Sequence, residues 1–344
     1  MTIILNLMFG RKRGGLEQVA VDYHEALSPR HNVTTVMSQD AWSLAEVRKL
    51  PHGQSHVISP YGDWDPFAAM ALRSLAKKTG AQIAICTGNR AVGLGQRALG
   101  GVTPVVGVAQ NYKLKRFARC DAGFGPTQDL VRTLQGLGIP AANTFHIPNM
   151  VRIPPPLAKP KNPVPVIGSM GRFVEKKGFA HYIKALGALK RSGARFKAIL
   201  GGDGELQEDL QALTLAEGLT GELIFQGWVV DKQAFFAQLD IFVLPSLHEP
   251  FGIVLIEAMA AGMPCITTDS EGPSEITSHD VDGVIYPKGD AEALTKALND
   301  LLHAPEKATA MGAAARARAI ETYDIAAVGA RMDAAIATIL SARL

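Results

Sequence analysis

Cysteine is scarce in this chain. Its 344 residues include only Cys86, Cys120 and Cys265, which are scattered and form no C-x-x-C or zinc spacing. An odd, unpatterned set predicts reduced thiols and excludes a disulfide framework. No apolar run approaches the roughly 20 residues of a membrane-spanning helix. The first run, "TIILNLM", is too short for a signal peptide, and its basic residues follow it rather than precede it. We therefore expect a cytoplasmic protein.

Two common cofactor motifs are also missing. The first predicted strand is followed by "FGRKRGG" rather than G-x-G-x-x-G, which disfavours a dinucleotide-dependent dehydrogenase. The letters of an Asp-x-Asp metal motif occur once, in "DWD" (63–65), but no strand precedes them and a predicted helix follows. We therefore expect no cofactor and no metal requirement.

Composition and charge indicate the number of domains and the kind of partner. The chain is too long for one ordinary core, and its 47% hydrophobic and 19% charged residues suit a globular protein with two. Residues 1–150 contain 16 Lys and Arg against 9 Asp and Glu, a net +7, whereas the remainder contains 19 against 23, a net −4. The basic half indicates an anionic partner, although solubility alone explains such a balance as well.

Short apolar runs alternate with amphipathic segments along the whole chain. This order predicts an α/β fold with parallel sheets. In the first half the predicted strands are 2–8, 32–37, 82–86, 104–109, 122–125 and 144–147, and the predicted helices are 16–27, 66–78 and 127–138. In the second half the strands are 166–170, 196–202, 223–227, 241–246, 264–269 and 283–286, with helices near 178–192, 204–217, 232–238, 253–262 and 290–303 and a short one after Pro273.

A proline-rich segment divides the two halves. Six prolines lie between Pro154 and Pro165, and proline suits neither a helix interior nor a central strand. We therefore predict a first domain over 1–150, a stiff linker over 151–164, a second domain over 165–322 and a C-terminal helix over 323–344 that crosses back to the first domain. Ligands of open parallel sheets bind beyond the carboxyl ends of the strands, so we expect the site in a cleft between two doubly wound domains.

The stretch "HEPFGIVLIEAM" (248–259) is the most informative. A strand ends before it, and Gly252 precedes an apolar helix that Gly262 and Pro264 terminate. A helix N-terminus behind glycine suits phosphate. Glu249 and Glu257 flank it at a spacing that is long for paired glycosidase carboxyls, so we expect them to hold two ends of one ligand. Taken alone, they also read as a helix-dipole acid and a surface residue.

Three glycine-rich turns accompany this stretch. In "VIGSMGRFVEKKGF" a strand is followed by Gly171, Arg172 and Lys177, and a guanidinium beside an ammonium suits a pyrophosphate. "LGGDGE" (200–205) is a further strand-to-helix turn, and Gly14 and Gly15 lie between the first strand and helix. Each turn alone is weak, because solvated charge or a flexible loop explains it as well.

Together and in this order, the motifs resemble those of the retaining glycosyltransferases of family 4. Glu249 and Glu257 fit the family's E-x7-E motif, and Gly171, Arg172 and Lys177 fit its G-R-x4-K motif. "GGDGE", "GGLE", "EGPSEI" (271–276) and "DGVIYPKGDAEALTKAL" (282–298) resemble further stretches. The resemblance implies a GT-B fold, with the acceptor domain first and the nucleotide-sugar domain second.

The resemblance also implies roles for single residues. Glu257 would bind the ribose, and Glu249 the hydroxyls of the transferred sugar. Arg172 and Lys177 would neutralise the leaving diphosphate. The remaining donor contacts would come from backbone or glycine positions at Gly252, Ile253, Gly171, Gly14 and Gly15, and the base would lie near Gly227, Trp228 and Val229.

One position departs from the family pattern. Many members carry a histidine near the stretch that is "VGVAQNYKLKRF" (106–117) here, but the matching places hold Gln110 and Asn111. Because glutamine cannot act as a base, these two are assigned only to the acceptor side.

The expected function is therefore transfer of a sugar from a nucleotide diphosphate sugar to an acceptor hydroxyl, with retention, in lipopolysaccharide, glycolipid or other cell-envelope glycan synthesis. The basic clusters Arg11–Lys12–Arg13 and Lys113–Lys115–Arg116 suggest an anionic glycan or lipid acceptor and peripheral contact with the inner face of an anionic membrane, and nothing suggests nucleic acid. Two alternatives stay open: a nucleotide-sugar epimerase of the same architecture, and a nucleotide-sugar-binding protein without turnover.

Overall fold

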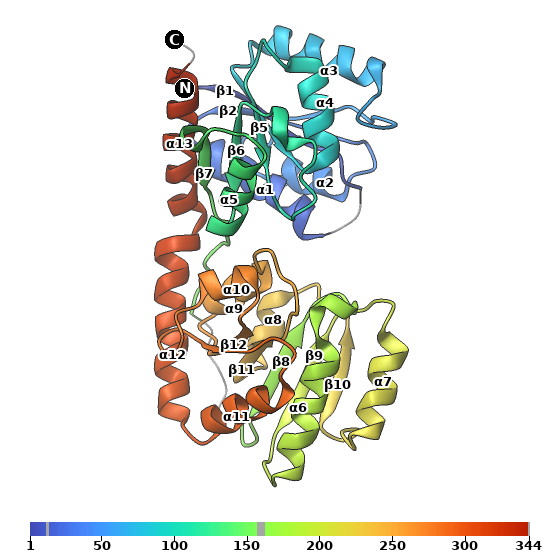
Figure 1. The fold of residues 1–344 in the computed structure, drawn as a ribbon, viewed down its shortest axis with the longest axis vertical. Helices are drawn as coiled ribbons and strands as arrows, with labels where there is room; N and C mark the ends of the chain where they lie inside the picture. The colour runs from blue at the N-terminus through green and yellow to red at the C-terminus, as the bar shows by residue number, and fades with distance from the viewer. Residues whose placement is uncertain (12–13, 157–161, 343–344) are drawn as a thin grey trace. The chain divides into compact units, whose positions relative to one another are not determined.

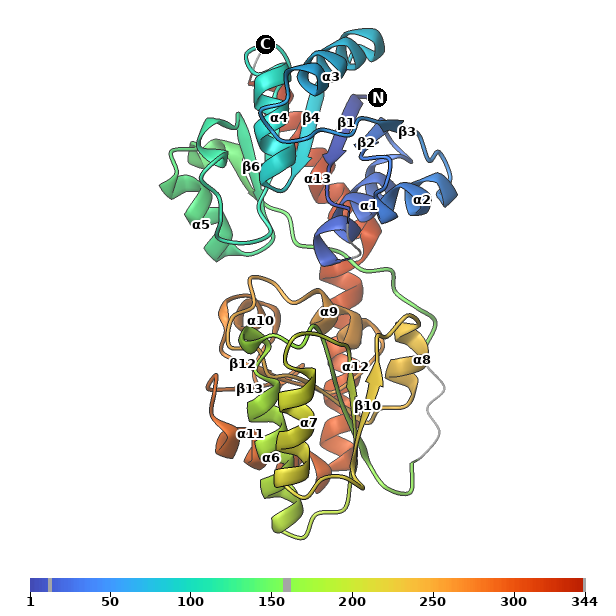
Figure 2. The same ribbon diagram turned by 90° about the vertical axis from the view of Figure 1, so that its right-hand side faces the viewer.

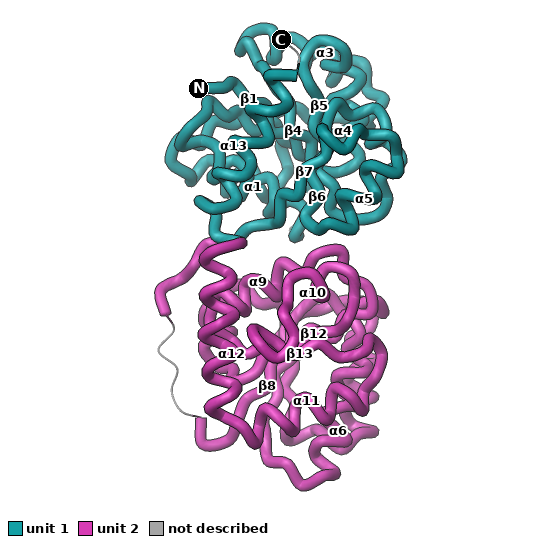
Figure 3. Tube along the Cα trace, turned by 60° about the vertical axis from the view of Figure 1, so that its left-hand side comes forward, with its two compact units in different colours: residues 1–150, 323–344 teal, residues 151–322 magenta. Residues whose placement is uncertain are grey.

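The computed structural model describes residues 1–11, 14–156 and 162–342. These residues form two compact units (Figure 3). Unit 1 contains residues 1–150 and the C-terminal segment from Tyr323, and unit 2 contains residues 151–322.

Unit 1 is built on a seven-stranded parallel sheet in the order β3-β2-β1-β4-β5-β6-β7 (Figure 1). Its strands are β1 (Ile3–Met8), β2 (Asn32–Met37), β3 (Ser55–Val57), β4 (Ile83–Thr87), β5 (Val105–Val108), β6 (Ala122–Gly125) and β7 (Thr144–His146). Its helices are α1 (Gly15–Leu27), α2 (Trp42–Lys49), α3 (Pro66–Thr79), α4 (Asn89–Leu99), α5 (Gln128–Gly136) and α13 (Ile325–Ser341).

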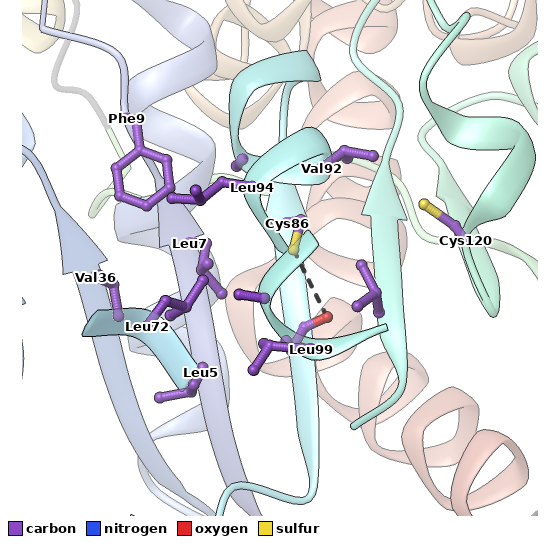
Figure 4. Close-up of a cluster of buried hydrophobic side chains, with 14 of the residues drawn as sticks. Leu5, Leu7, Phe9, Val36, Leu72, Cys86, Val92, Leu94, Leu99 and Cys120 are labelled. Carbon is purple, nitrogen blue, oxygen red and sulfur yellow. Dashed lines mark hydrogen bonds between the residues drawn. The ribbon is translucent and has the colours of Figure 1, made fainter. Parts of the chain in front are cut away.

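Apolar strand residues form a core on each face of this sheet. On one face, Leu5 and Leu7 of β1 pack with Leu72 of α3 and Leu94 of α4 (Figure 4). On the other face, residues of β1 and β2 pack with α1 and α2. Cys86, Cys120 and Cys265 are all buried, and the described residues contain no disulfide.

Three elements of unit 1 were not predicted from the sequence. Strand β3 has only three residues, and α2 is a short helix of eight. Helix α4 carries two glycines, which lower helix propensity. Tertiary packing explains these two glycines, because a Cβ at Gly95 would lie 2.7 Å from Cys86 Sγ and a Cβ at Gly93 would lie 2.6 Å from the Asp63 carboxylate.

Unit 2 is built on a six-stranded parallel sheet in the order β10-β9-β8-β11-β12-β13. Its strands are β8 (Val166–Met170), β9 (Lys197–Gly201), β10 (Leu223–Gly227), β11 (Ile241–Leu244), β12 (Cys265–Thr268) and β13 (Val284–Tyr286). Its α-helices are α6 (Phe179–Arg191), α7 (Gln207–Ala216), α8 (Lys232–Ala237), α9 (Ile253–Ala260), α10 (Glu271–Ile276), α11 (Ala291–Leu302) and α12 (Pro305–Arg318). Helices α6 and α7 lie on one face of the sheet and α12 runs behind it (Figure 2).

The strand order of unit 2 decides where a ligand fits. The chain leaves β8 toward β9 on one side and later returns to β11 on the other, so the topological switch point lies between β8 and β11. Open α/β sheets bind ligands at this point, beyond the carboxyl ends of the strands. The loops after β8 and β11 are those that carry Arg172, Lys177 and Glu249.

The C-terminal segment is helical and consists of two helices with a break between them. Helix α12 packs on α9 of unit 2, where Arg316 donates to the carbonyls of Ala260 and Pro154. A π-helical turn, Ala319–Tyr323, separates it from α13, which packs on α1 of unit 1, so the helix returns to the first unit as predicted. Asp333 of α13 accepts from Arg30 and, at 3.0 Å, from His31. Within the described ranges, no helix is both long and apolar enough to cross a membrane.

Candidate functional site

Three glycine-rich turns meet at the carboxyl ends of β8, β9 and β10. The N–H of Gly171 donates to the Gly201 carbonyl at 3.0 Å, and that of Gly202 to the Gly227 carbonyl at 2.7 Å. A Cβ at Gly202, where φ is +130°, would lie 1.9 Å from the Gly171 carbonyl oxygen. The weak "GGDGE" signal thus has a structural reason: backbone approaches backbone here, and only glycine fits.

The loop after β8 is also joined to the loop after β11. The N–H groups of Leu247 and His248 both donate to the Lys176 carbonyl, at 2.9 and 3.2 Å. Gly178 has φ +68°, and a Cβ there would lie 2.0 Å from the Pro245 carbonyl oxygen. The two loops that border the switch point therefore form one surface.

Helix α9 begins at this surface. Its N-cap is Gly252, in the left-handed region with φ +106°, and Ile253 is its first residue. The first N–H groups of a helix have no partner within it and carry the positive end of its dipole. Gly252 is buried, and no side chain of its own covers these donors.

Glu249 lies before α9 and is paired with the loop after β8. Its Oε2 accepts from the Lys177 ammonium, and the two side chains are only 12% and 18% exposed. The interpretation of Glu249 as a helix-dipole acid is thus incomplete, because its charge is matched by a lysine. Arg172, by contrast, is exposed and has no carboxylate partner among the described residues.

A second acid, Glu271, holds the backbone of Glu249. Its Oε2 accepts from the Glu249 N–H at 3.2 Å, while its Oε1 contacts His248 Nδ1 at 3.2 Å. In return, the Gly272 N–H donates to the Glu249 carbonyl at 2.8 Å. Partial burial opposes ionisation of Glu271, but these donors outweigh it and lower its pKa. Helix α10 starts at Glu271, so Pro273 lies inside the predicted short helix rather than before it.

Glu257 is in the second turn of α9, and the interpretation of it as a surface residue is wrong. Its side chain is 15% exposed, and Oε1 accepts from Lys232 Nζ at 2.5 Å. Oε2 is buried and has no hydrogen-bond partner among the described residues. Burial raises the pKa of Glu257, although Lys232 opposes the shift. A buried, unsatisfied acceptor is costly, so this oxygen is suited to a donor from a ligand.

The end of β10 contributes an exposed aromatic ring. Gly227 has φ +73°, and Trp228 is 48% exposed. Val229 packs back over Gly201, where a Cβ would lie 2.5 Å from Val229 Cγ2. The turn thus presents its ring and its backbone groups at the end of the sheet, an arrangement suited to a flat ring.

The remaining predicted site residues belong to unit 1. Gln110 and Asn149 exchange two amide hydrogen bonds, at 2.8 and 3.0 Å, so both side-chain amides are occupied. Asn111 is exposed and accepts from the Lys113 N–H at 2.9 Å. Gly14 is the N-cap of α1 and Gly15 is its first residue.

The two basic clusters are partly neutralised. Arg11 pairs with Asp40 at 3.2 Å, and Arg116 pairs with Asp63. Lys12 and Arg13 lie outside the described residues. The "DWD" acids have structural partners, because Asp65 caps α3 by accepting from the N–H groups of Phe67 and Ala68. In the portion of the chain that is described, no group of three potential metal ligands occurs.

The partners of two predicted site residues, Glu257 and Gln110, were not predicted from the sequence. Lys232 and Asn149 carry no local motif, and each meets its partner only through the fold. Glu271 was indicated by the sequence, because it lies in the stretch "EGPSEI", which resembles the family.

Glu249, Lys177 and Glu257 all lie in one region of the sequence that matches a known family. Residues 153–318 match the family of glycosyl transferases group 1. This match covers nearly all of unit 2.

Two curated relatives are similar over part of their length. The chain is 39% identical over 141 residues to the lipopolysaccharide core biosynthesis glycosyltransferase LpsE of Rhizobium meliloti, covering 40% of this chain and 39% of the relative. It is 36% identical over 155 residues to the lipopolysaccharide core biosynthesis glycosyltransferase LpsD of the same organism, covering 44% of this chain and 44% of the relative. The chain thus spans about two fifths of the length of these relatives.

The fold is similar over the whole chain. The crystal structure of Anabaena HepE in complex with UDP-glucose has a TM-score of 0.84 and 20% identity, covering 98% of this chain and 100% of that one. The two parallel α/β units therefore form the GT-B fold, as the sequence predicted.

Proposed function

We propose that this protein is a retaining glycosyltransferase of family 4 that transfers a sugar from a nucleoside diphosphate sugar to an acceptor hydroxyl. The arrangement of unit 2 that supports this best is the Lys177–Glu249 pair before the N-terminus of α9. One helical turn further on lies Oε2 of Glu257, which has no partner among the described residues. Cations and helix N–H groups suit a diphosphate, and carboxylates suit sugar hydroxyls.

In this proposal Glu257 binds the ribose. Its free Oε2 accepts from one hydroxyl, and its Oε1 accepts from the other or from Lys232. The base stacks near Gly227, Trp228 and Val229, beside the edge strand β10. The HepE structure was determined with UDP-glucose. We therefore take uridine diphosphate as the first nucleotide to test.

The diphosphate lies over Gly171, Gly252 and Ile253, close to Arg172 and Lys177. The bond between the anomeric carbon and the diphosphate oxygen breaks, and the electron pair leaves with the diphosphate. The acceptor oxygen forms the new bond to the anomeric carbon on the same face, and its proton passes to the departing diphosphate oxygen. Arg172, Lys177 and the α9 N–H groups stabilise the growing negative charge, which is the form of catalysis that depends on preorganised donors. Glu249, held by Lys177 and by its backbone contact with Glu271, orients the hydroxyls of the transferred sugar.

The acceptor is proposed to bind unit 1. Gln110 and Asn111 take the place of the family's histidine, and Gly14 and Gly15 allow close approach to the donor. The amide of Gln110 is not basic and is paired with Asn149, so Gln110 serves in positioning and not as a base. No metal is required, since arginine, lysine and a helix terminus supply the positive charge.

We place the reaction in cell-envelope glycan synthesis at the cytoplasmic face of a membrane. Two relatives with 39% and 36% identity are lipopolysaccharide core glycosyltransferases. The net +7 charge of residues 1–150 suits an anionic glycan or lipid acceptor and peripheral contact with an anionic membrane.

Nucleotide binding is the first test. Calorimetry with nucleoside diphosphates should identify one base, and Glu257→Ala should weaken binding by a few kcal/mol, since hydrogen bonds to charged groups contribute about 1.5–3 kcal/mol each. Unchanged affinity in a folded Glu257→Ala protein would remove Glu257 from the ribose role.

Turnover with the matching nucleotide sugar and an acceptor extract separates the alternatives. A transferase releases free nucleoside diphosphate and labels the acceptor with the anomeric configuration retained. An epimerase changes the sugar and keeps it activated, and a binding protein does neither. Activity should survive a chelator, and full loss in EDTA would contradict the metal-free mechanism.

A further inference from the structure

A cluster of apolar side chains stands exposed at the start of α3. Thirteen large apolar side chains are exposed among the described residues, and four of them fall within ten positions. These four, called the aromatic edge below, are Tyr61, Trp64, Phe67 and Met70, with exposed fractions of 91%, 64%, 79% and 67%. Such a concentration on a water-soluble surface marks an interaction site.

Local structure holds the aromatic edge in place. Asp65 caps α3 and also accepts from the Tyr61 N–H at 3.1 Å, so the turn before the helix is fixed. A Cβ at Gly62 would lie 2.5 Å from the Trp64 indole nitrogen, which shows that the ring lies over this glycine. On the other side of α3, Leu72 is fully buried in the core of unit 1 (Figure 4). The helix is thus anchored by one face, and the aromatic edge projects from the other.

The stretch of sequence that follows the turn before α3 carries charge of one sign. Residues 66–120 contain no Asp or Glu. Their cationic residues number nine: Arg73, Lys77, Lys78, Arg90, Arg97, Lys113, Lys115, Arg116 and Arg119. The two acids within the aromatic edge segment are both engaged, Asp63 with Arg116 and Asp65 as the helix cap.

Several of these cations lie beside the aromatic edge. The Asp63–Arg116 ion pair joins the turn that carries Trp64 to the loop that carries the exposed Lys113 and Lys115. Lys77 and Lys78 are exposed at the end of α3 itself. Aromatic rings and flexible lysines therefore share one surface of unit 1.

We propose that this surface docks on an anionic lipid bilayer. Tyr61 and Trp64 enter the headgroup region, where amphipathic rings are favoured, and Phe67 buries its apolar ring beside them. The lysines contact lipid phosphates. The proposal deepens the membrane contact included in the proposed function and gives it a location. It places this contact at α3 and the 113–116 loop, and it does not depend on sugar transfer.

Vesicle co-sedimentation of the full chain tests the proposal. Vesicles of phosphatidylcholine are compared with vesicles containing about a third phosphatidylglycerol, at low and high salt. We expect binding to the anionic vesicles that falls with salt, because the Debye length shrinks from roughly 30 Å at 0.01 M to 3 Å at 1 M. The double variant Trp64→Ser, Phe67→Ser should bind at least tenfold more weakly, and Lys77→Gln, Lys78→Gln should lose most of the salt-sensitive part.

The matched control is Leu215→Ser, Val281→Ser, which removes two side chains of unit 2 that are 68% and 62% exposed. It should bind vesicles like the wild type. Equal loss in this control, no binding to anionic vesicles, or unchanged binding of the Trp64 and Phe67 variant would overturn the proposal. Sedimentation velocity adds one more outcome: a dimer that the Trp64 and Phe67 variant converts to monomer would make this surface a contact between copies. Nucleoside diphosphate affinity, measured on the same samples, reports separately on the proposed function.

Discussion

Lys177 donates from its ammonium group to Glu249 Oε2, although 72 positions separate the two residues in the chain. The contact joins the loops that follow β8 and β11, the two strands at the switch point of unit 2. The Lys177–Glu249 ion pair therefore contributes both to the fold and to the proposed chemistry. Arg172 has no carboxylate partner among the described residues, so it should contribute to the chemistry alone, and mutation can distinguish the two residues.

Lys177→Ala should lower both stability and kcat. It leaves the Glu249 carboxylate unpaired, at a cost on the order of 2 kcal/mol, below the 3–5 kcal/mol of fully buried pairs because both side chains keep some exposure. The exposed Arg172 is the matched comparison. Arg172→Ala should reduce kcat more than it raises KM and leave the unfolding temperature unchanged, since the diphosphate charge grows only as the bond breaks. Denaturant unfolding and steady-state kinetics on both variants check this. Normal turnover in both would contradict the assigned leaving-group role.

Glu257 should make stability depend on pH. Its pKa is raised in the folded protein from an ordinary value of 4.5, so between that value and the raised one the folded state binds more protons than the unfolded state. The free energy of unfolding therefore decreases as pH rises through this window. Glu257→Gln should remove that decrease. Thermal unfolding of both proteins from pH 4 to pH 8 measures it, and an identical pH dependence would show that Glu257 ionises normally.

Much of this arrangement was predictable from the sequence. The doubly wound halves, helix α9 and the placement of Glu249, Arg172 and Lys177 at strand ends follow from hydrophobic runs, glycines and spacing. The ion pair of Glu257 with Lys232 and the Gln110–Asn149 pair do not, because each joins residues from different elements whose distance only the fold decides. Helix α4 was not predicted for the same reason. Its two glycines are required by close contacts with β4 and with Asp63, and they do not mark the end of a helix.

Gly178 should be essential for joining the loops after β8 and β11. Alanine there would place its Cβ against the Pro245 carbonyl and force φ +68° on a residue that disfavours it. We expect Gly178→Ala to cost about 2 kcal/mol or more, from strain of 1–3 kcal/mol plus the displaced carbonyl. Gly221→Ala is the control in the same unit, because a Cβ there meets nothing within 4 Å and φ is not in the left-handed region. Equal stability of the two variants in urea unfolding would refute the steric argument.

The Gln110–Asn149 pair should be coupled energetically. Each amide both donates to and accepts from the other, at 2.8 and 3.0 Å, and Asn149 is almost fully buried. Truncating either residue leaves the partner's polar atoms unsatisfied, at about 1–3 kcal/mol. Removing both side chains leaves no polar atom without its partner. The double variant Gln110→Ala, Asn149→Ala should therefore lose less stability than the two single variants lose when their destabilisations are added. A double-mutant cycle should give a coupling energy of roughly 0.5–3 kcal/mol. Strict additivity would mean that the pair does not hold Gln110 in place, and Gln110 would then be free to turn toward the acceptor in the proposed reaction.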